Sequence, residues 1–182
     1  ATVVYSKEGV AERLKREGRN SPADIVLTTE IGQLLELVEQ DLTQPVTSAT
    51  VAANVPAAYR ADDGQWIGLT LRVRNIYASR ERGIPTNLDY EDLANPRFKG
   101  KVCTRSGKHP YNIGLIASMI ATQGEAETRK WLEGVKANLA RKPQGNDREQ
   151  VKAIKEGLCD ASLGNSYYYG AMLSETEQKP WA

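Results

Sequence analysis

The spacing of apolar and polar residues along the first part of the chain predicts strands that alternate with helices. Apolar runs at residues 1–5 and 24–28 are typical of buried strands. Each run is followed by a helical pattern, the first from Ser6 to a stop at Gly18 and the second over residues 31–38. Such alternation favours a parallel or mixed α/β sheet, in which ligands bind at the carboxyl ends of the strands.

A longer stretch, residues 66–77, predicts a strand that alternates its two faces. Its leucine and valine side chains fall on one face, whereas Arg72 and Arg74 fall on the other. The pattern therefore presents two guanidinium groups from an otherwise apolar strand. An edge strand with a solvated face produces the same pattern, so the sequence alone leaves the role of these arginines open.

The C-terminal part predicts two further strands, each of which leads to tyrosine residues. Strand 101–104 is followed by a loop that delivers Tyr111, and strand 158–163 leads to Tyr167 and Tyr168. Helical patterns begin at Asn112, Glu125 and Asp147. Because a side chain at a junction of strand, loop and helix can face a cleft, these tyrosines are candidates for a binding site.

The composition limits the classes of partner. The chain has 182 residues, with 24 basic and 23 acidic side chains and a net charge of +1. A chain so close to neutral lacks the positive surface that nucleic acids and anionic membranes attract. No apolar run approaches the roughly 18 residues of a membrane span. We therefore expect no nucleic-acid binding and no membrane insertion, from a chain long enough for one large or two small domains.

Three of the eight tyrosines stand side by side at residues 167–169, just after a predicted strand. Where a strand turns into a helix, two neighbouring phenol groups can converge and form a hard, oxygen-only site. Ferric iron suits such a site, because oxygen ligands select hard ions and a bound cation stabilises a phenolate whose free pKa is about 10. The alternative is a half-buried aromatic cluster that packs on a sheet face. Composition alone leaves both interpretations open.

Three motifs, in order along the chain, resemble the bacterial ferric-ion-binding proteins of iron(III) ABC importers. They are TRSGKHPYN at residues 104–112, NLARKPQG at 138–145 and GNSYY at 164–168. The resemblance extends from near Gly9 to the C-terminus and is strongest to members that hold iron mainly through tyrosines, without a glutamate ligand. It implies an α/β, periplasmic-binding-protein-like fold of type II with two lobes.

The resemblance also implies how the chain is divided. Residues 1–74 would form the central part of the first lobe, and residues 75–182 most of the second. Whole members of the family are longer at both ends, so we expect this sequence to be an internal fragment, incomplete at both ends.

The same resemblance implies a site and a role. Ferric iron would lie in the interlobe cleft on Tyr111, Tyr167 and Tyr168, while Tyr169 points away. Arg72 matches an arginine that binds a carbonate or bicarbonate sharing the metal, a task that suits the planar guanidinium fork. The expected protein is a periplasmic or otherwise extracytoplasmic, surface-anchored monomer. It would deliver iron to the permease of an inner-membrane ABC importer and catalyse no reaction.

The two cysteines and the single histidine complete the candidate chemistry. Cys103 and Cys159 lie on strands that we expect side by side, and their separation does not suit a zinc site. In an exported protein, a disulfide is expected for such a pair. His109 has no second histidine to work with, so we interpret it as an ordinary loop residue before Pro110.

Two alternative functions stay open. The same fold binds other small solutes, such as sulfate, thiamine or polyamines, although those sites do not need three converging phenols. An enzyme on the same fold would need a free, reactive thiol at Cys103 or Cys159. Titration of thiols under denaturing conditions separates the enzyme from the binding protein.

Overall fold

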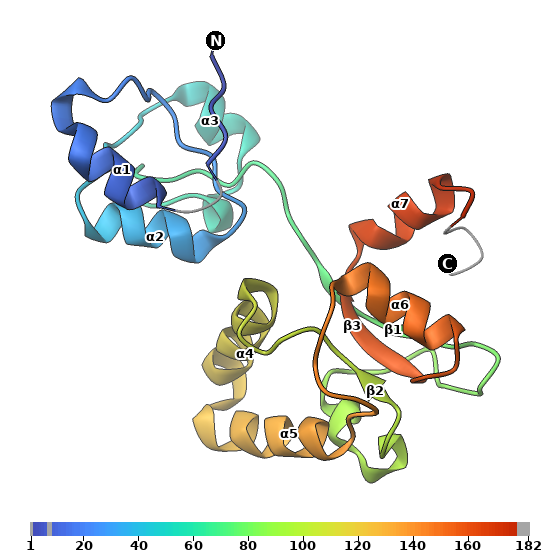
Figure 1. The fold of residues 1–182 in the computed structure, drawn as a ribbon. Coiled ribbons are helices and arrows are strands. Elements are labelled where there is room, and N and C mark those ends of the chain that lie inside the picture. The colour runs from blue at the N-terminus through green and yellow to red at the C-terminus, as the bar shows by residue number, and fades with distance from the viewer. Residues whose placement is uncertain (1, 7–8, 178–182) are drawn as a thin grey trace. The chain divides into compact units, whose positions relative to one another are not determined.

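The chain forms two compact units, which the computed structural model describes over residues 2–6 and 9–177 (Figure 1). The units are Ala1–Leu71 and Arg72–Ala182. The side chains of Arg72 and Arg74 both make their hydrogen bonds within the second unit. The expected division into lobes after Arg74 stays a prediction. Each unit is described on its own.

The first unit is helical in its described residues. Its α-helices are α1 (Val10–Glu17), α2 (Ile31–Glu39) and α3 (Ala49–Asn54), with 3-10 helices at Gly18–Asn20 and Ala57–Tyr59. Gly18 ends α1 as expected, since its φ of 52° lies in a region that favours glycine. The Ser48 side chain accepts a hydrogen bond from the Val51 N–H and so caps α3.

The strands expected at residues 1–5 and 24–28 are wrong for the residues that the structure describes there. Residues 2–5 and 24–28 have no strand conformation, and Val3, Ile25 and Leu27 are exposed. A strand exists only when a neighbour accepts its backbone hydrogen bonds, whereas apolar content is visible in the sequence without that neighbour. For the same reason, only the last part of the predicted strand 66–77 is a strand. Residues 68–73 have no ladder partner.

The second unit is built on a mixed three-stranded sheet in the order β1-β3-β2 (Figure 1). β1 (Arg74–Ala78) pairs antiparallel with β3 (Ala161–Asn165), and β2 (Val102–Cys103) pairs parallel with β3. The accompanying helices are α4 (Pro110–Gln123), α5 (Glu125–Ala137), α6 (Asp147–Lys155) and α7 (Tyr167–Ser174), with 3-10 helices at Glu91–Ala94 and Pro96–Phe98. The mixed α/β class is therefore confirmed in this unit.

The central strand β3 is buried along its whole length and separates two packed layers. Ala161 and Leu163 join a core with side chains of α4 and α5, including Trp131. The next residue, Gly164, lies on the opposite face against the ring of Tyr77, and a Cβ added there would come within 2.6 Å of a Tyr77 ring carbon. Alternation along β3 thus assigns one face to α4 and α5, and leaves room on the other for the Tyr77 ring.

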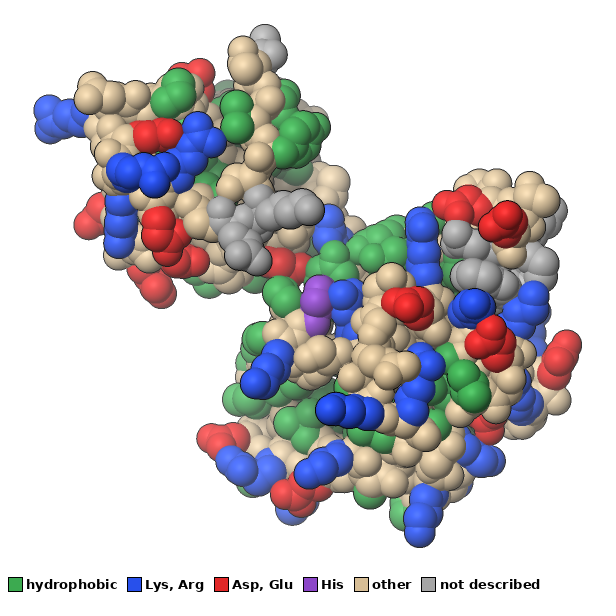
Figure 2. Space-filling model, in the orientation of Figure 1, with side chains coloured by type: hydrophobic (Ala, Val, Ile, Leu, Met, Phe, Trp, Pro, Cys, Tyr) green, Lys and Arg blue, Asp and Glu red, His purple; other side chains and the backbone are tan. Residues whose placement is uncertain are grey.

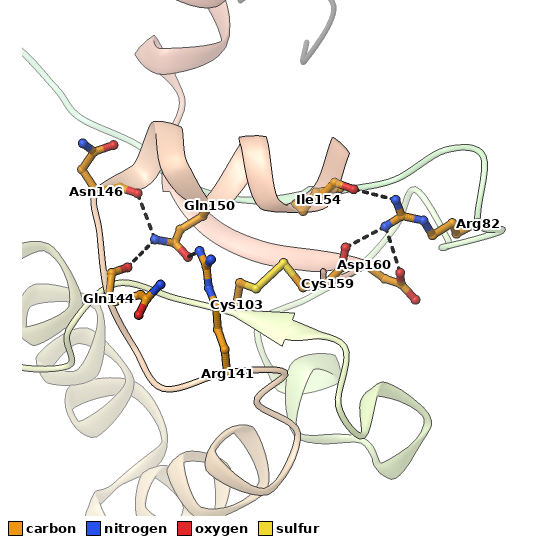
Figure 3. Close-up of a disulfide and its surroundings, with 9 residues drawn as sticks. All are labelled: Arg82, Cys103, Arg141, Gln144, Asn146, Gln150, Ile154, Cys159 and Asp160. Carbon is orange, nitrogen blue, oxygen red and sulfur yellow. Dashed lines mark hydrogen bonds and ion pairs between the residues drawn. A yellow bond between two sulfur atoms is a disulfide. The ribbon is translucent and has the colours of Figure 1, made fainter. Parts of the chain in front are cut away.

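A disulfide joins Cys103 at the end of β2 to Cys159 just before β3, with the two Cα atoms 5.8 Å apart (Figure 3). Arg82 lies beside it and donates hydrogen bonds to the carbonyl oxygens of Cys159 and Ile154, each at 2.6 Å. Its guanidinium also pairs with Asp160 at 3.0 Å. Both cysteines of the sequence are therefore bonded to each other, which removes the reactive thiol that an enzyme would need.

Charged side chains of both signs cover the surface of the described residues. Figure 2 shows basic and acidic side chains interspersed over the visible face of each unit. Among the residues that the structure describes, none of the helices has the length and apolar character needed to cross a membrane.

Candidate metal centre

Two tyrosine hydroxyls and one guanidinium meet at one end of the sheet in the second unit. The hydroxyls of Tyr111, in the first turn of α4, and Tyr167, at the start of α7, lie 3.2 Å apart. The Arg72 guanidinium donates a hydrogen bond of 2.8 Å to the Tyr111 oxygen. Three segments that are far apart in the sequence thus bring polar groups to one small region.

The topology explains why these groups converge. Strands β2 and β3 run parallel, so their carboxyl ends reach the same edge of the sheet. The loop after β2 leads to α4 with Tyr111, and β3 leads through Ser166 to α7 with Tyr167. A site at this edge follows from the direction of the strands, as the sequence pattern predicts.

Tyr168 lies next to this pair. Its ring packs against that of Tyr167 with the centroids 4.6 Å apart. Burial, with smaller contributions from the neighbouring Tyr167, raises the pKa of Tyr168 to about 12. The structure therefore brings together Tyr111, Tyr167 and Tyr168, the tyrosines singled out from the sequence.

Tyr167 has the opposite shift in pKa. Burial acts to raise its pKa, but hydrogen bonds with Tyr111, Asn165 and Tyr168 and the positive charge of Arg72 outweigh burial, so the pKa is lowered. Of the adjacent pair, Tyr167 therefore gives up its proton more readily than Tyr168.

Tyr169 takes a different position from its two neighbours. Its side chain is 47% exposed, and its backbone N–H donates a hydrogen bond to the Tyr77 hydroxyl at 3.2 Å. The same hydroxyl donates to the carbonyl oxygen of Asn165 at 2.8 Å. Tyr77 thus links the last residue of β3 to the first turn of α7, which contains Tyr167 and Tyr168.

His109 has a structural role that the sequence reading missed. It is the N-cap of α4, where its Nδ1 accepts a hydrogen bond from the Tyr111 N–H at 3.2 Å. Burial lowers the pKa of His109, and the Arg105 guanidinium lowers it further, so the ring stays neutral and able to accept. The signal in the sequence was Pro110, since proline favours the first position of a helix and places His109 at the cap.

Three guanidinium groups surround the ring of Tyr111. The central carbons of Arg72, Arg74 and Arg105 lie 5.8, 5.8 and 5.2 Å from its centroid. Guanidinium groups are attracted to the electron-rich face of an aromatic ring. Tyr111 therefore lies in strongly basic surroundings.

A buried ion pair lies behind the tyrosines, and the sequence reading did not find it. Asp147 is fully buried at the start of α6, and its carboxylate accepts hydrogen bonds from Arg74 at 2.6 Å and Arg105 at 3.2 Å. The capping box of Asn146 and Glu149 fixes this helix start. That box is visible in the sequence as Asn-Asp-Arg-Glu, but the partners of Asp147 are not.

Arg72 and Arg74 have different partners and different exposure. Arg74 is the first residue of β1 and its guanidinium is buried in the ion pair with Asp147. Arg72 precedes the strand, so the pleat does not set its direction, and its guanidinium reaches Tyr111. Only Arg72 of these two is exposed beside the tyrosine hydroxyls.

Carboxylate, thiolate and imidazole side chains do not form a metal site in the part of the chain that the structure describes. No group of three or more His, Cys, Asp or Glu residues comes together there. A metal at the edge of the sheet would therefore depend on the tyrosine oxygens, which are hard ligands.

Solved structures of ferric-binding proteins share this architecture. The apo ferric ion-binding protein A of Pasteurella haemolytica matches 95% of this chain, with a TM-score of 0.88 and 54% identity. The ferric iron-binding protein A of Mannheimia haemolytica, in an open conformation, matches 98% of it, with a TM-score of 0.90 and 53% identity. The chain covers 55% and 57% of those two structures.

Sequence comparison gives the same result. The iron uptake protein A2 of Synechocystis sp. is 43% identical over 176 residues, which are 96% of this chain and 51% of that protein. The chain thus spans about half the length of the curated relatives it matches. The family model described as bacterial extracellular solute-binding protein matches residues 20–178. With a type II periplasmic-binding-protein fold and this match over most of its length, the chain belongs to the bacterial extracellular solute-binding proteins.

Proposed function

We propose that this chain binds ferric iron through the phenolate oxygens of Tyr111, Tyr167 and Tyr168. The observation that carries the proposal is that tyrosine hydroxyls from two different helices meet. Those of Tyr111 and Tyr167 lie 3.2 Å apart, and the ring of Tyr168 packs directly against that of Tyr167. A purely structural aromatic cluster needs ring contact but has no reason to gather its oxygens.

The spacing of the oxygens suits a small, hard cation. An octahedral ion with metal–oxygen bonds of about 2.0–2.1 Å holds adjacent ligand oxygens roughly 3 Å apart. The 3.2 Å between the Tyr111 and Tyr167 oxygens is close to that value. Little movement of these two side chains is then needed for both to bind one ion.

The named relatives support iron over the other solutes considered. They include iron uptake protein A2 of Synechocystis sp. and a Trichodesmium structure in complex with iron and citrate ligands. Sulfate, thiamine or a polyamine has no use for three converging phenols. By the same argument the whole protein delivers iron from the periplasm, or another extracytoplasmic place, to the permease of an ABC importer.

Arg72 is the proposed anion site. Three phenolates balance the charge of a ferric ion but leave coordination positions for a carbonate or bicarbonate. That anion needs a cation beside it, and Arg72 is exposed and already directed to the Tyr111 oxygen at 2.8 Å. A guanidinium keeps its charge at any physiological pH and matches the planar anion with two N–H groups.

Replacing Arg72 with Ala is therefore expected to weaken ferric binding in bicarbonate buffer by about 10–100-fold. Removing a residue that supports a metal ligand commonly has an effect of this size. Without bicarbonate the loss should be several-fold smaller. Arg97→Ala is the matched control, because Arg97 is an exposed arginine paired with Asp92 away from the tyrosines. Arg74 is unsuitable as a control, since its removal leaves Asp147 buried without its nearest partner. Equal losses for Arg72→Ala in both buffers would mean that Arg72 has no part in holding the anion.

Ferric binding is also expected to release protons and to strengthen as pH rises. Phenol ligands must lose their protons before they bind a metal, so low pH favours the free chain. The raised pKa of Tyr168, about 12, means that this residue carries its proton at neutral pH. At saturating iron, the native chain should release about one proton more than Tyr168→Phe. A pH indicator in weakly buffered solution measures the difference, and equal release would remove Tyr168 from the ligand set.

The direct solution test is a titration of the chain with ferric citrate, followed by visible absorbance. Bound phenolates should give an intense phenolate-to-iron charge-transfer band that stops growing at one iron per chain. The absence of any band at saturating iron would contradict the proposed function. Sulfate, thiamine and spermidine, added without iron, should leave the unfolding temperature of the chain unchanged.

A further inference from the structure

Asn165 links the tyrosines to the buried ion pair. It is the last residue of β3 and is only 3% exposed. Its Nδ2 donates a hydrogen bond to the Tyr167 hydroxyl oxygen at 3.1 Å, and its Oδ1 accepts one from Arg74 at 3.0 Å. The two ends of one amide therefore contact a proposed iron ligand and a buried guanidinium.

Arg74 determines which end of the amide faces the tyrosine. A guanidinium can only donate hydrogen bonds, so it must face the oxygen of the Asn165 amide and not the nitrogen. The NH₂ group is then left to face the Tyr167 oxygen. Without Arg74 the amide is free to turn, because its two ends have nearly the same shape.

The position of Arg74 is itself fixed by other partners. One of its nitrogens contacts Asp147 at 2.6 Å, and the other donates to the Oδ1 of Asn112 at 2.8 Å. Asp147 also accepts from the backbone N–H of Asn165 at 3.0 Å. Asn112 directly follows Tyr111 in α4, so one guanidinium is tied to the neighbours of two proposed ligands.

We propose that Asn165 is a positioning residue of the metal centre: its amide, oriented by Arg74, directs the Tyr167 oxygen toward Tyr111 and holds it there. The inference rests on the proposed iron-binding function. Outer partners of metal ligands commonly orient those ligands and tune the metal. An N–H that donates to a phenolate withdraws electron density from its oxygen and raises the energy of the charge-transfer band.

Asn165→Ala removes the amide but leaves the contact between Arg74 and Asp147 in place. We expect the band to move to longer wavelength and ferric affinity to fall by about 10–100-fold. Asn138→Ala is the matched control. Asn138 is equally buried, at 3% exposed, and its amide donates to the carbonyl oxygens of Leu93 and Asn95 instead of a tyrosine. The control should lower the unfolding temperature without moving the band.

Arg74→Lys tests the orientation of the amide separately. The lysine keeps a positive charge for Asp147, but one ammonium group cannot reproduce the contacts of the guanidinium fork. We expect a band shift in the same direction as for Asn165→Ala, but smaller. In the iron-free protein, the side-chain amide protons of Asn165 should exchange with solvent at least about tenfold faster in Arg74→Lys than in the native chain. An amide that can turn loses its hydrogen bonds more often and is less protected from exchange.

The two proposals fail in different ways. A native chain with no band contradicts the iron-binding function itself. A native band whose wavelength and affinity are unchanged in Asn165→Ala contradicts the positioning role while iron binding stands. Equal exchange of the Asn165 amide protons in the native chain and Arg74→Lys, measured without iron, contradicts the part assigned to Arg74.

Discussion

Tyr167→Phe is expected to weaken ferric binding by more than about 100-fold. This loss is larger than that for a residue that only supports a metal ligand, which is about 10–100-fold. The substitution keeps the ring and deletes only the oxygen at the centre of the cluster. That oxygen contacts the hydroxyl of Tyr111 and the amide of Asn165. Competition with citrate, followed at the charge-transfer band, measures the change in affinity.

Tyr169→Phe is the control for this substitution. It deletes the same atom from the residue two positions further along α7, which is 47% exposed. Its affinity should stay within about twofold of the native value, and the unfolding temperatures of both variants should match that of the native chain. Equal ferric affinities for Tyr167→Phe and Tyr169→Phe would show that Tyr167 has only a packing role and is not an iron ligand.

Loss of the disulfide is expected to give the largest change in stability. Replacing both Cys103 and Cys159 by Ala should lower the free energy of unfolding of the second unit by about 4 kcal/mol, because the disulfide closes a loop of 56 residues. Both side chains are buried, so alanine also leaves a small gap. Hydrogen exchange of the β3 amides measures the effect within this unit alone.

Reduction of the native chain provides the matched control for the disulfide. A reductant should lower the protection of the β3 amides in the native chain and have no effect on the double Ala variant. The helix amides of α2, in the other unit, should be unchanged in both. If the double Ala variant loses less than about 1 kcal/mol of unfolding free energy, the stabilising role of the disulfide is contradicted. The loop-closure entropy for such a loop predicts a loss several times larger.

Features that depend on neighbouring residues in the chain could be predicted from the sequence. The periodicity of apolar residues located α2, α5 and α6 closely, and Gly18 marks the end of α1 as expected. The junctions that carry Tyr111 and Tyr167 were found because the two strands before them are short and apolar. Their convergence follows from the parallel pairing of β2 and β3.

Apart from the disulfide between Cys103 and Cys159, the features that depend on distant partners could not be predicted from residue patterns. The apolar runs at residues 2–5 and 24–28 look like strands, yet a strand also needs a ladder partner, and the described residues show none for either run. Arg74 and Asp147 are 73 positions apart, so their pairing leaves no local pattern. The amide of Asn165 is likewise an ordinary polar residue in the sequence until Arg74 and Tyr167 are seen on its two sides.

The identity of the site also depended on geometry. Three adjacent tyrosines are compatible both with a packed aromatic cluster and with an oxygen-ligand site. Contact between the rings of Tyr167 and Tyr168 suits either interpretation. The approach of the Tyr111 hydroxyl to that of Tyr167 favours the second, because Tyr111 belongs to a different helix and contributes its oxygen at 3.2 Å.

A crystal structure of the chain with ferric iron and bicarbonate, using anomalous scattering at the iron edge, tests the ligand set most directly. We expect one strong anomalous peak at about 2 Å from the hydroxyl oxygens of Tyr111, Tyr167 and Tyr168, the bond length of a small octahedral cation. A planar anion should lie between the peak and the Arg72 guanidinium. A peak that is bonded to other residues, or none at the three tyrosines under saturating iron, would contradict the proposed site.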